Sequence, residues 1–146
     1  MITYEQLIGT PSAEDLEQLR QLYLSNGWLE ASETQTGQVI TSIITHTFCF
    51  AVARDDGKII GMGRSISDGV SDAYIQDVTV LPQYRKRGIG GGLIQFLVDF
   101  LHAQGINWIG LISEPGYENF YREQGFAIMP GYTPFLYVGK KKTDKV

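Results

Sequence analysis

A glycine-rich turn constrains this 146-residue chain more than any other feature. Gly88, Gly90, Gly91 and Gly92 follow directly on the cationic run Arg85-Lys86-Arg87 and open an amphipathic helix with an apolar residue at every fourth position. Each helical glycine costs about 1 kcal/mol relative to alanine, so three in one turn require a compensating role. Glycines let a ligand approach the backbone, and the free N–H groups of a helix start attract anions. The turn therefore predicts a phosphate or pyrophosphate site.

Two common phosphate motifs are absent from this turn. The Walker pattern GxxxxGK[ST] needs Lys and then Ser or Thr where this chain has Leu93 and Ile94. The dinucleotide pattern GxGxxG, begun at Gly88, meets Leu93 at its third glycine position. The alternative interpretation is a turn that only permits close packing of helix on sheet, with cations on the surface.

Composition narrows the class of protein further. The length suits one domain (1–146), and 43% hydrophobic residues exclude wholesale disorder. A formal net charge of −4 argues against general nucleic-acid binding. The sequence has neither a signal-peptide pattern nor an apolar run long enough for a membrane span, so we expect a cytoplasmic protein with no membrane partner. The single cysteine, Cys49, lies in an apolar run and is expected in the core, and no residue cluster has metal-ligand spacing.

Hydrophobic periodicity predicts an α/β domain. Helices are expected at 12–24, with Ser12 as the N-cap, at about 32–45, from 88 onward and at 117–124. Strands are expected at 47–53, 58–67, 73–81, 106–113 and 135–138. The long helix between the third and fourth of these strands implies a right-handed parallel crossover, in a sheet that begins with antiparallel strands.

Two motifs resemble those of the GNAT acyltransferase superfamily. Arg85-x-x-Gly88-x-Gly90, preceded by the strand Ile75–Pro82, is similar to the family's acetyl-CoA signature. Asn119–Phe126 is similar to its second signature, a short helix that carries a tyrosine and ends in Gly-Phe, and Gly61–Gly69 is similar to a strand of an aralkylamine-acetyltransferase-like subgroup. The resemblance implies a mixed, mostly antiparallel sheet with a central splayed parallel strand pair flanked by helices.

The resemblance also implies where acetyl-CoA binds. In the family, backbone N–H groups of the turn hold the pyrophosphate. By match, these groups and the charges beside them belong to Arg85, Lys86, Arg87, Gly88, Gly90 and Gly91. The backbone of Val78 and Val80 would hold the acetyl group and pantetheine, although both residues also suit a core. Asn119 would hydrogen-bond the cofactor.

The same matches name candidates for proton transfer. Tyr121 matches the family's usual general acid, which protonates the departing thiolate, and Tyr117 one turn earlier is a second candidate. The alternative for Tyr121 is a packed aromatic side chain. Asp77 lies in a largely apolar strand, where an unpaired carboxylate is costly, and is the candidate base. A structural role for Asp77, with a water as base, stays open.

The resulting prediction is an N-acetyltransferase that moves acetyl from acetyl-CoA to a primary amine by direct attack in a ternary complex. The acceptor would be a small-molecule or peptide amine, and 11 of the 16 acidic residues precede residue 85, which favours a cationic one. Candidates to contact it are Trp28, Arg64, Asp68 and Tyr74, unless Arg64 and Asp68 pair with each other. The alternatives are a non-catalytic acyl-CoA-binding or sensing module on the same scaffold and a nucleotide-binding protein. A homodimer is left open.

Overall fold

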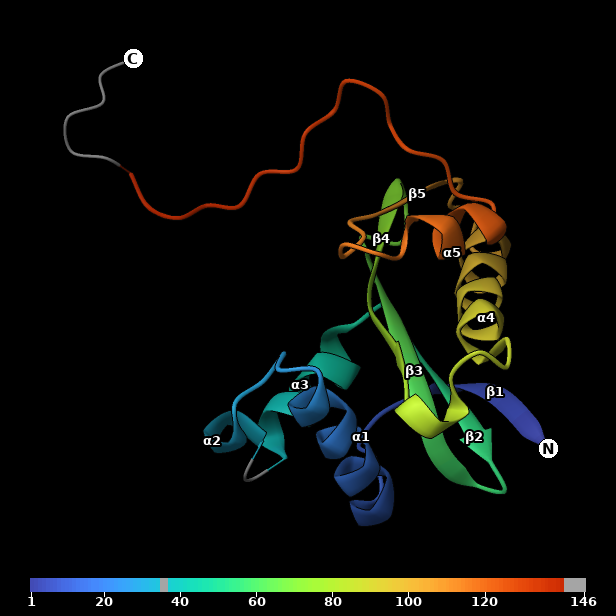
Figure 1. The fold of residues 1–146 in the computed structure, drawn as a ribbon. Coiled ribbons are helices and arrows are strands. Elements are labelled where there is room, and N and C mark those ends of the chain that lie inside the picture. Colours follow the sequence, from blue (N-terminus) through green and yellow to red (C-terminus); the bar gives the residue numbers. More distant parts are fainter. Residues whose placement is uncertain (35–36, 141–146) are drawn as a thin grey trace. The chain divides into compact units, whose positions relative to one another are not determined.

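The computed structural model describes residues 1–34 and 37–140, which divide into two units, one up to Leu111 and one from Ile112 onward. The elements of the first unit are β1 (Ile2–Leu7), α1 (Ala13–Ser25), α2 (Ala31–Thr34), α3 (Gln38–His46), β2 (Cys49–Asp55), β3 (Lys58–Ser67), β4 (Asp72–Val80), the 3₁₀ turn η1 (Pro82–Tyr84), α4 (Ile89–Ala103) and β5 (Trp108–Leu111) (Figure 1). The second unit carries α5 (Glu118–Glu123).

The first unit is built on a mixed sheet with the strand order β1-β2-β3-β4-β5. Strands β1 to β4 run antiparallel to their neighbours, whereas β5 runs parallel to β4, and α4 forms the crossover between that parallel pair. The β4–β5 ladder covers only Asp72–Ile75, and beyond it β4 pairs with β3 alone among the described residues. The predicted mixed sheet, with a parallel pair that separates midway, is confirmed.

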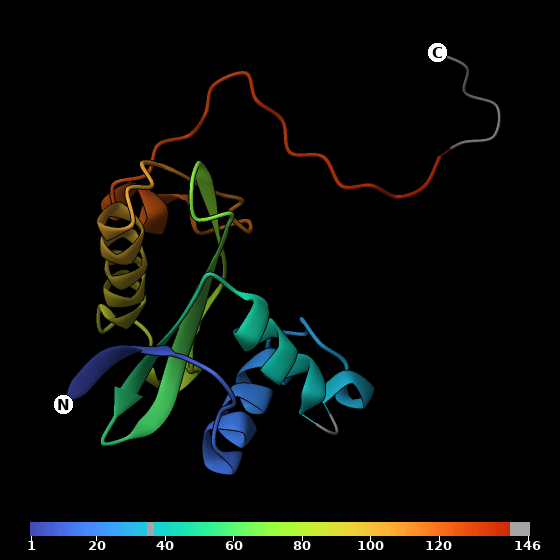
Figure 2. The ribbon, with the colours of Figure 1, turned by 180° about the vertical axis from the view of Figure 1, so that it is seen from behind.

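Helix α4 covers one face of the sheet, and α1 with α3 covers the other (Figures 1 and 2). On the α4 face, β3 presents glycines. A Cβ atom at Gly61 would lie 3.2 Å from Leu93 Cδ1, and one at Gly63 would lie 3.2 Å from Leu97 Cδ1. Both distances are tighter than ordinary van der Waals contact, so α4 rests almost directly on the backbone of β3.

The opposite face carries a core of large apolar side chains from α1, α3, β2 and β3. Its buried members are Leu19, Leu22, Tyr23, Ile40, Ile44, Phe50, Val52, Ile59 and Met62. Helix α1 begins as the sequence predicts, because the Ser12 hydroxyl accepts the N–H of Asp15 (3.1 Å). Arg54 on β2 then donates to the Asp15 carboxylate (2.7 Å) and to that of Glu5. These contacts fix α1 across the sheet.

Three elements differ from the sequence-based expectation. Strand β1 was not predicted, although alternate residues of Ile2–Leu7 are partly buried against β2. The helix expected at 32–45 is two helices separated by Gly37, whose φ of +72° interrupts the helix, and residues 35–36 of that prediction lie outside the described residues. Residues 135–138 form no strand and their side chains are 83–92% exposed, because β-branched and aromatic residues form a strand only where a neighbouring strand pairs with them.

Candidate active site

The second half of β4 is interrupted by a β-bulge. Where β3 contributes one residue, Gly63, β4 contributes two, Asp77 and Val78. Asp77 has a φ of +56°, in the left-handed region that costs an ordinary residue about 1–2 kcal/mol. A bulge leaves its extra residue out of the ladder and re-aims the backbone beside it. The β4–β5 ladder ends at Ile75, so the bulge lies beyond the point where β4 separates from β5.

The Asp77 side chain is held by two donors. Arg64 Nε donates to Asp77 Oδ2 at 2.6 Å, and the Tyr23 hydroxyl donates to the same oxygen at 3.0 Å. Arg64 is itself fixed by the Thr47 hydroxyl (3.2 Å). Burial raises the pKa of Tyr23 far above its ordinary value, and the negative charge of Asp77 adds to the rise, so Tyr23 keeps its proton and remains a donor. We call Tyr23, Arg64 and Asp77 the Asp77 clasp, and it supplies the partners that a carboxylate in an apolar strand requires.

The glycine-rich turn follows β4 through η1. Gly88 caps α4 with a φ of +79°, and it has no side chain to accept the first helical N–H groups. The first intrahelical bond runs from the Gly92 N–H to the Gly88 carbonyl (3.0 Å), which leaves the amides of residues 89–91 outside the helical ladder. Arg85 Nε donates to the carbonyl oxygen of Val80 (3.0 Å) and ties the turn to the end of β4.

The remaining residues of the turn have separate roles. The Arg87 guanidinium lies 5.2 Å from the centre of the Tyr84 ring, a cation–π contact, and Lys86 is exposed. At Gly92, an added Cβ would overlap the Tyr4 hydroxyl, so this glycine is needed for packing of α4 on β1. The packing interpretation of the turn thus applies to Gly92, whereas the amides of residues 89–91 remain available to an anion.

In the second unit, Tyr121 sits in a small aromatic cluster on α5. Its ring packs edge to face against Phe120 (5.0 Å between centroids) and Phe126 (6.1 Å). Desolvation raises the pKa of Tyr121, and the negative charge of Glu114 raises it further. The hydroxyl therefore keeps its proton at neutral pH, as a general acid must. Asn119 is exposed on the same short helix.

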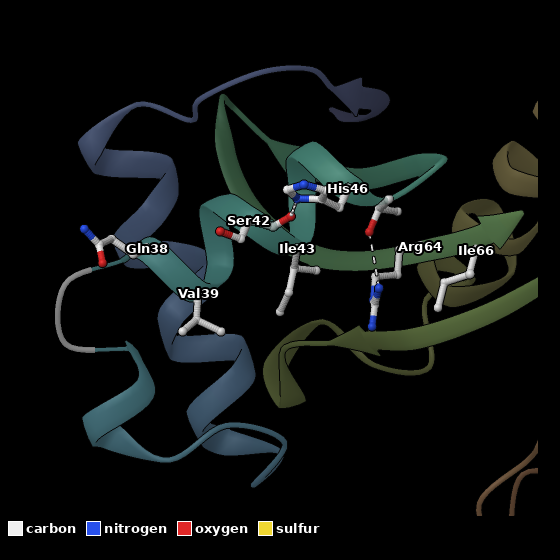
Figure 3. Close-up of a pocket in the computed structure, with 8 residues that line it drawn as sticks. Gln38, Val39, Ser42, Ile43, His46, Arg64 and Ile66 are labelled. Carbon is white, nitrogen blue, oxygen red and sulfur yellow. Dashed lines mark hydrogen bonds between the residues drawn. The ribbon is translucent and has the colours of Figure 1, made fainter. Parts of the chain in front are cut away.

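A pocket of about 620 Å³ lies between α3 and β3, within the size range of small-ligand sites (Figure 3). Its described lining is Gln38, Val39, Ser42, Ile43, His46, Thr47, Arg64 and Ile66. None of these residues is acidic. Because Arg64 belongs both to the pocket wall and to the Asp77 clasp, the pocket adjoins the bulge of β4.

The four acceptor candidates from the sequence occupy different environments. Arg64 lines the pocket, but its ion pair is with Asp77, so the Arg64–Asp68 pair considered from the sequence is wrong. Asp68 accepts two N–H groups of its own turn between β3 and β4. Trp28 packs edge to face on Tyr23 (6.3 Å) beside the core and does not line the described pocket.

The fourth candidate, Tyr74, belongs to an exposed row that starts at the pocket. Tyr74 lies opposite the pocket residue Ile66 on β3 and packs edge to face with Trp108 on β5 (5.3 Å). We call Ile66, Tyr74 and Trp108 the apolar strip, and they are 42%, 46% and 41% exposed. Gly110 makes room for it, since a Cβ there would meet the Trp108 ring at 2.7 Å.

Sequence reasoning missed the wall that α3 supplies to the pocket. Gln38, Ser42 and His46 recur at every fourth position, opposite the buried Ile40 and Ile44, so they share one face of the helix. That spacing was readable from the sequence. It carried no sign of what would lie opposite, because β3 is distant along the chain.

Comparison with known proteins places this geometry among acetyltransferases. The model of the Acetyltransferase (GNAT) family matches residues 13–126. The chain is 28% identical over 116 residues to an uncharacterized, ycf52-like N-acetyltransferase of Prochlorococcus marinus, covering 80% of this chain and 64% of that protein. It is 36% identical over 74 residues to serotonin N-acetyltransferase 2, chloroplastic, of Oryza sativa, covering 51% of this chain and 37% of that protein.

A solved structure of a GNAT-family acetyltransferase from Streptococcus pneumoniae has the same fold. It matches with a TM-score of 0.74 at 26% identity and covers 97% of this chain and 100% of that one. The chain spans less than two thirds of the length of either curated relative.

Proposed function

Because the chain belongs to the GNAT acetyltransferase family, whose members use acetyl-CoA as co-substrate, we propose that it transfers an acetyl group from acetyl-CoA to a primary amine. The observation that carries the proposal is the bulge at Asp77 in the half of β4 that β5 leaves unpaired. Unused main-chain groups at that point suit an extended, amide-bearing ligand, and the glycine-rich turn follows within the same chain segment.

The turn and the strand bind different parts of the cofactor in this proposal. The pyrophosphate accepts hydrogen bonds from the backbone N–H groups of Arg87, Gly88, Gly90, Gly91 and their neighbours, and Lys86 with Arg85 adds positive charge. The pantetheine arm lies along the backbone of Val78 and Val80. The Val78 N–H polarises the thioester carbonyl and stabilises the negative charge that develops on its oxygen. Asn119 supplies a further hydrogen bond.

The chemistry is a direct transfer. The acceptor ammonium first loses a proton to Asp77 or to water, and the neutral nitrogen then forms a C–N bond with the acetyl carbonyl carbon. When the C–S bond breaks, Tyr121 donates its proton to the departing thiolate. The nitrogen, positively charged after the attack, then loses a second proton, which returns through water to the Tyr121 oxygen and leaves a neutral amide. The Tyr121 hydroxyl carries its proton at neutral pH, as this role requires, although its raised pKa makes it a weaker acid than a free tyrosine.

The pocket and the apolar strip indicate an acceptor with one positive charge and an apolar body. A polyamine would need carboxylates for its further charges, and the described lining contains none. The strip instead offers an isoleucine and two aromatic rings to a ligand that extends out of the pocket. The rice relative is named for serotonin, an aromatic monoamine. We therefore favour a small aryl- or alkylamine, which carries the single positive charge of a cationic acceptor, over a polyamine, with a peptide amine as the alternative.

Isothermal titration with acetyl-CoA, followed by release of free CoA across a panel of aromatic monoamines, polyamines, amino acids and peptides, tests the proposal. We expect binding, and turnover that is fastest with aromatic monoamines. Tyr121→Phe should lower kcat by about 100- to 10,000-fold, the usual contribution of a general acid, with little change in KM. Tyr132→Phe is the matched control, because Tyr132 is exposed and outside α5.

Three contrary results are possible, and each changes a different part of the proposal. Binding of acetyl-CoA without transfer to any amine, together with a silent Tyr121→Phe, would identify a sensing module. Displacement of CoA by ATP or NAD would identify a nucleotide-binding protein. Full turnover by Tyr121→Phe would remove this residue from the mechanism while leaving the transfer itself in place.

Location and assembly stay predictions. Within residues 1–34 and 37–140, no helix has the length and apolar character needed to cross a membrane. A cytoplasmic location and a single domain remain expectations from the sequence, and the homodimer stays open; the rice relative is described as chloroplastic. Size-exclusion chromatography with light scattering measures the assembly directly.

A further inference from the structure

Asp77 has two roles open to it in the proposed reaction, proton acceptor or anchor of the bulge. The structure favours the second. Arg64 and Tyr23 both donate to Oδ2, and the Arg64 contact, at 2.6 Å, is a charge-assisted hydrogen bond. If the carboxylate took up the proton of the acceptor, it would lose its ion pair with Arg64 in a partly buried site.

We infer that Asp77 is a positioning residue: the Asp77 clasp fixes the bulge of β4 so that the Val78 N–H points at the thioester carbonyl, and water removes the proton from the amine. This inference rests on the proposed acetyl transfer. It assigns Tyr23 and Arg64 to the active site as well, although neither contacts the reacting atoms.

The backbone of Asp77 is the first argument for this role. Its φ of +56° is unfavourable for a residue with a side chain, so the surrounding structure must hold it there. Aspartate and asparagine tolerate this conformation better than other residues, because their short polar side chains form local hydrogen bonds. In this chain the carboxylate instead accepts hydrogen bonds from side chains of two other elements, α1 and β3. These bonds restrain the backbone of residue 77.

The second argument is that other contacts bracket the same bulge. Two residues beyond Asp77, the Thr79 hydroxyl accepts a hydrogen bond from Asn26 Nδ2 (3.1 Å), so the end of α1 holds β4 on both sides of Val78. On β3, Gly63 lies opposite, and a Cβ there would come within 3.2 Å of Val78 Cγ2. The position of Val78 is therefore set from α1 and from β3 together.

Four single variants separate the two roles: Asp77→Asn, Asp77→Ala, Tyr23→Phe and the control Arg54→Met. Asparagine tolerates the left-handed conformation and its amide oxygen can still accept from Arg64, so Asp77→Asn should stay within about threefold of wild-type kcat. Asp77→Ala and Tyr23→Phe should lower kcat by about 10- to 100-fold, the scale of a misplaced catalytic group, with KM for the amine nearly constant. All should keep the wild-type pH profile.

Arg54→Met is matched to the clasp by environment. Arg54 and Asp15 are both 16% exposed in their ion pair, against 17% and 19% for Arg64 and Asp77, yet they lie away from the bulge. This variant should lose stability and keep kcat. A base at Asp77 predicts the opposite pattern: Asp77→Asn would fall by about 100- to 10,000-fold, as far as Asp77→Ala, and would lose the acidic limb of the kcat profile, while Tyr23→Phe stayed active. That pattern overturns the inference.

Hydrogen exchange of residues 72–81 tests the clasp without any acetyl transfer. We expect amides around Val78 to exchange about tenfold faster in Asp77→Ala and Tyr23→Phe than in the wild type, and unchanged in Asp77→Asn and Arg54→Met. Equal exchange in Asp77→Ala and wild type overturns the inference even if the enzyme is active. If the wild type acetylates no amine, the proposed function fails, and the exchange result alone decides the role of the clasp.

Discussion

The two faces of β3 meet opposite requirements. Toward α4 it presents Gly61 and Gly63, which let Leu93 and Leu97 approach the backbone. Toward α1 and α3 it presents Met62, Arg64 and Ile66. Met62 is fully buried, Arg64 forms an ion pair with Asp77 and lines the pocket, and Ile66 lines the pocket. At Gly61 and Gly63 one face sets the depth of a helix by having no side chain, and the other face supplies groups that surround the candidate site.

The comparison teaches that structural and functional residues can alternate along a single strand. Side chains of a strand point alternately to its two faces, so from Gly61 to Ile66 successive residues of β3 face α4 and the opposite face in turn. Gly63 belongs to both environments, since it faces Leu97 of α4 and lies opposite the bulge on β4. Removing side-chain atoms should therefore be harmful on the face toward α1 and α3, whereas adding atoms should be harmful on the face toward α4.

The largest effect is expected at the buried end of the side-chain face. Met62→Ala removes a fully buried side chain and should lower the free energy of unfolding by about 2–5 kcal/mol. Ile66→Ala, four residues along the same face, removes a side chain that is 42% exposed and should cost far less. Urea denaturation followed by circular dichroism measures both. Equal losses would mean that the gradient along this face does not exist.

On the glycine face, adding atoms should be harmful. The Cβ of Gly61→Val would lie 3.1 Å from the Thr79 carbonyl oxygen and 3.2 Å from Leu93, so overpacking should cost about 1–3 kcal/mol. Ile66→Val serves as the control, since it changes an exposed site on the other face. A Gly61→Val protein as stable as the wild type would show that α4 can move away from β3 at no cost.

A pH titration of stability probes the α4 face through Cys49, which is fully buried on β2. Burial raises the pKa of this thiol to about 12. In the unfolded chain the thiol ionises near pH 8.5, so above that pH the unfolded state binds fewer protons and stability falls, by up to about 1.4 kcal/mol per pH unit, until the folded pKa is reached. Thermal melts of Cys49→Ala should show a shallower decline between pH 8.5 and 10. Identical slopes would mean that the thiol is accessible in the folded state.

The smallest effect is expected on the apolar strip. Tyr74→Ala should raise KM for an aromatic monoamine by about 3- to 10-fold and leave kcat and stability nearly unchanged, because Tyr74 is 46% exposed. Val70→Ala, at an exposed apolar position (81%) in the turn before β4 and outside the strip, is the control. An unchanged KM in Tyr74→Ala would place the body of the acceptor elsewhere. A KM of the wild type that is lower for polyamines than for aromatic monoamines would contradict the argument from the absence of carboxylates in the described lining.

Local patterns in the sequence predicted the elements whose structure depends on neighbours along the chain. Helix α4, expected from residue 88 onward, and the strand at 58–67 were predicted closely. In both, the hydrophobic periodicity and the end signals lie within about fifteen residues. The Ser12 cap was predicted for the same reason. The glycine-rich turn also belongs to this class, since its open amides follow from the helix start.

The clasp could not be predicted in this way. Tyr23 and Asp77 are 54 positions apart, and their hydrogen bond depends on how α1 crosses the sheet. An aspartate in an apolar strand signalled that something must compensate its charge, but it did not say which residues would. The strand predicted at 135–138 failed for a related reason, since strand formation needs a pairing partner that composition does not reveal.

The pocket wall has an evolutionary consequence if the acceptor binds there. Five of its eight described residues come from α3, a helix of nine residues that contributes nothing to the clasp, the bulge or the glycine-rich turn. Exchanging one face of that helix would change which amines are accepted without disturbing the transfer chemistry on β4. On the proposed function, substrate choice would then be free to drift by substitution within a single short helix.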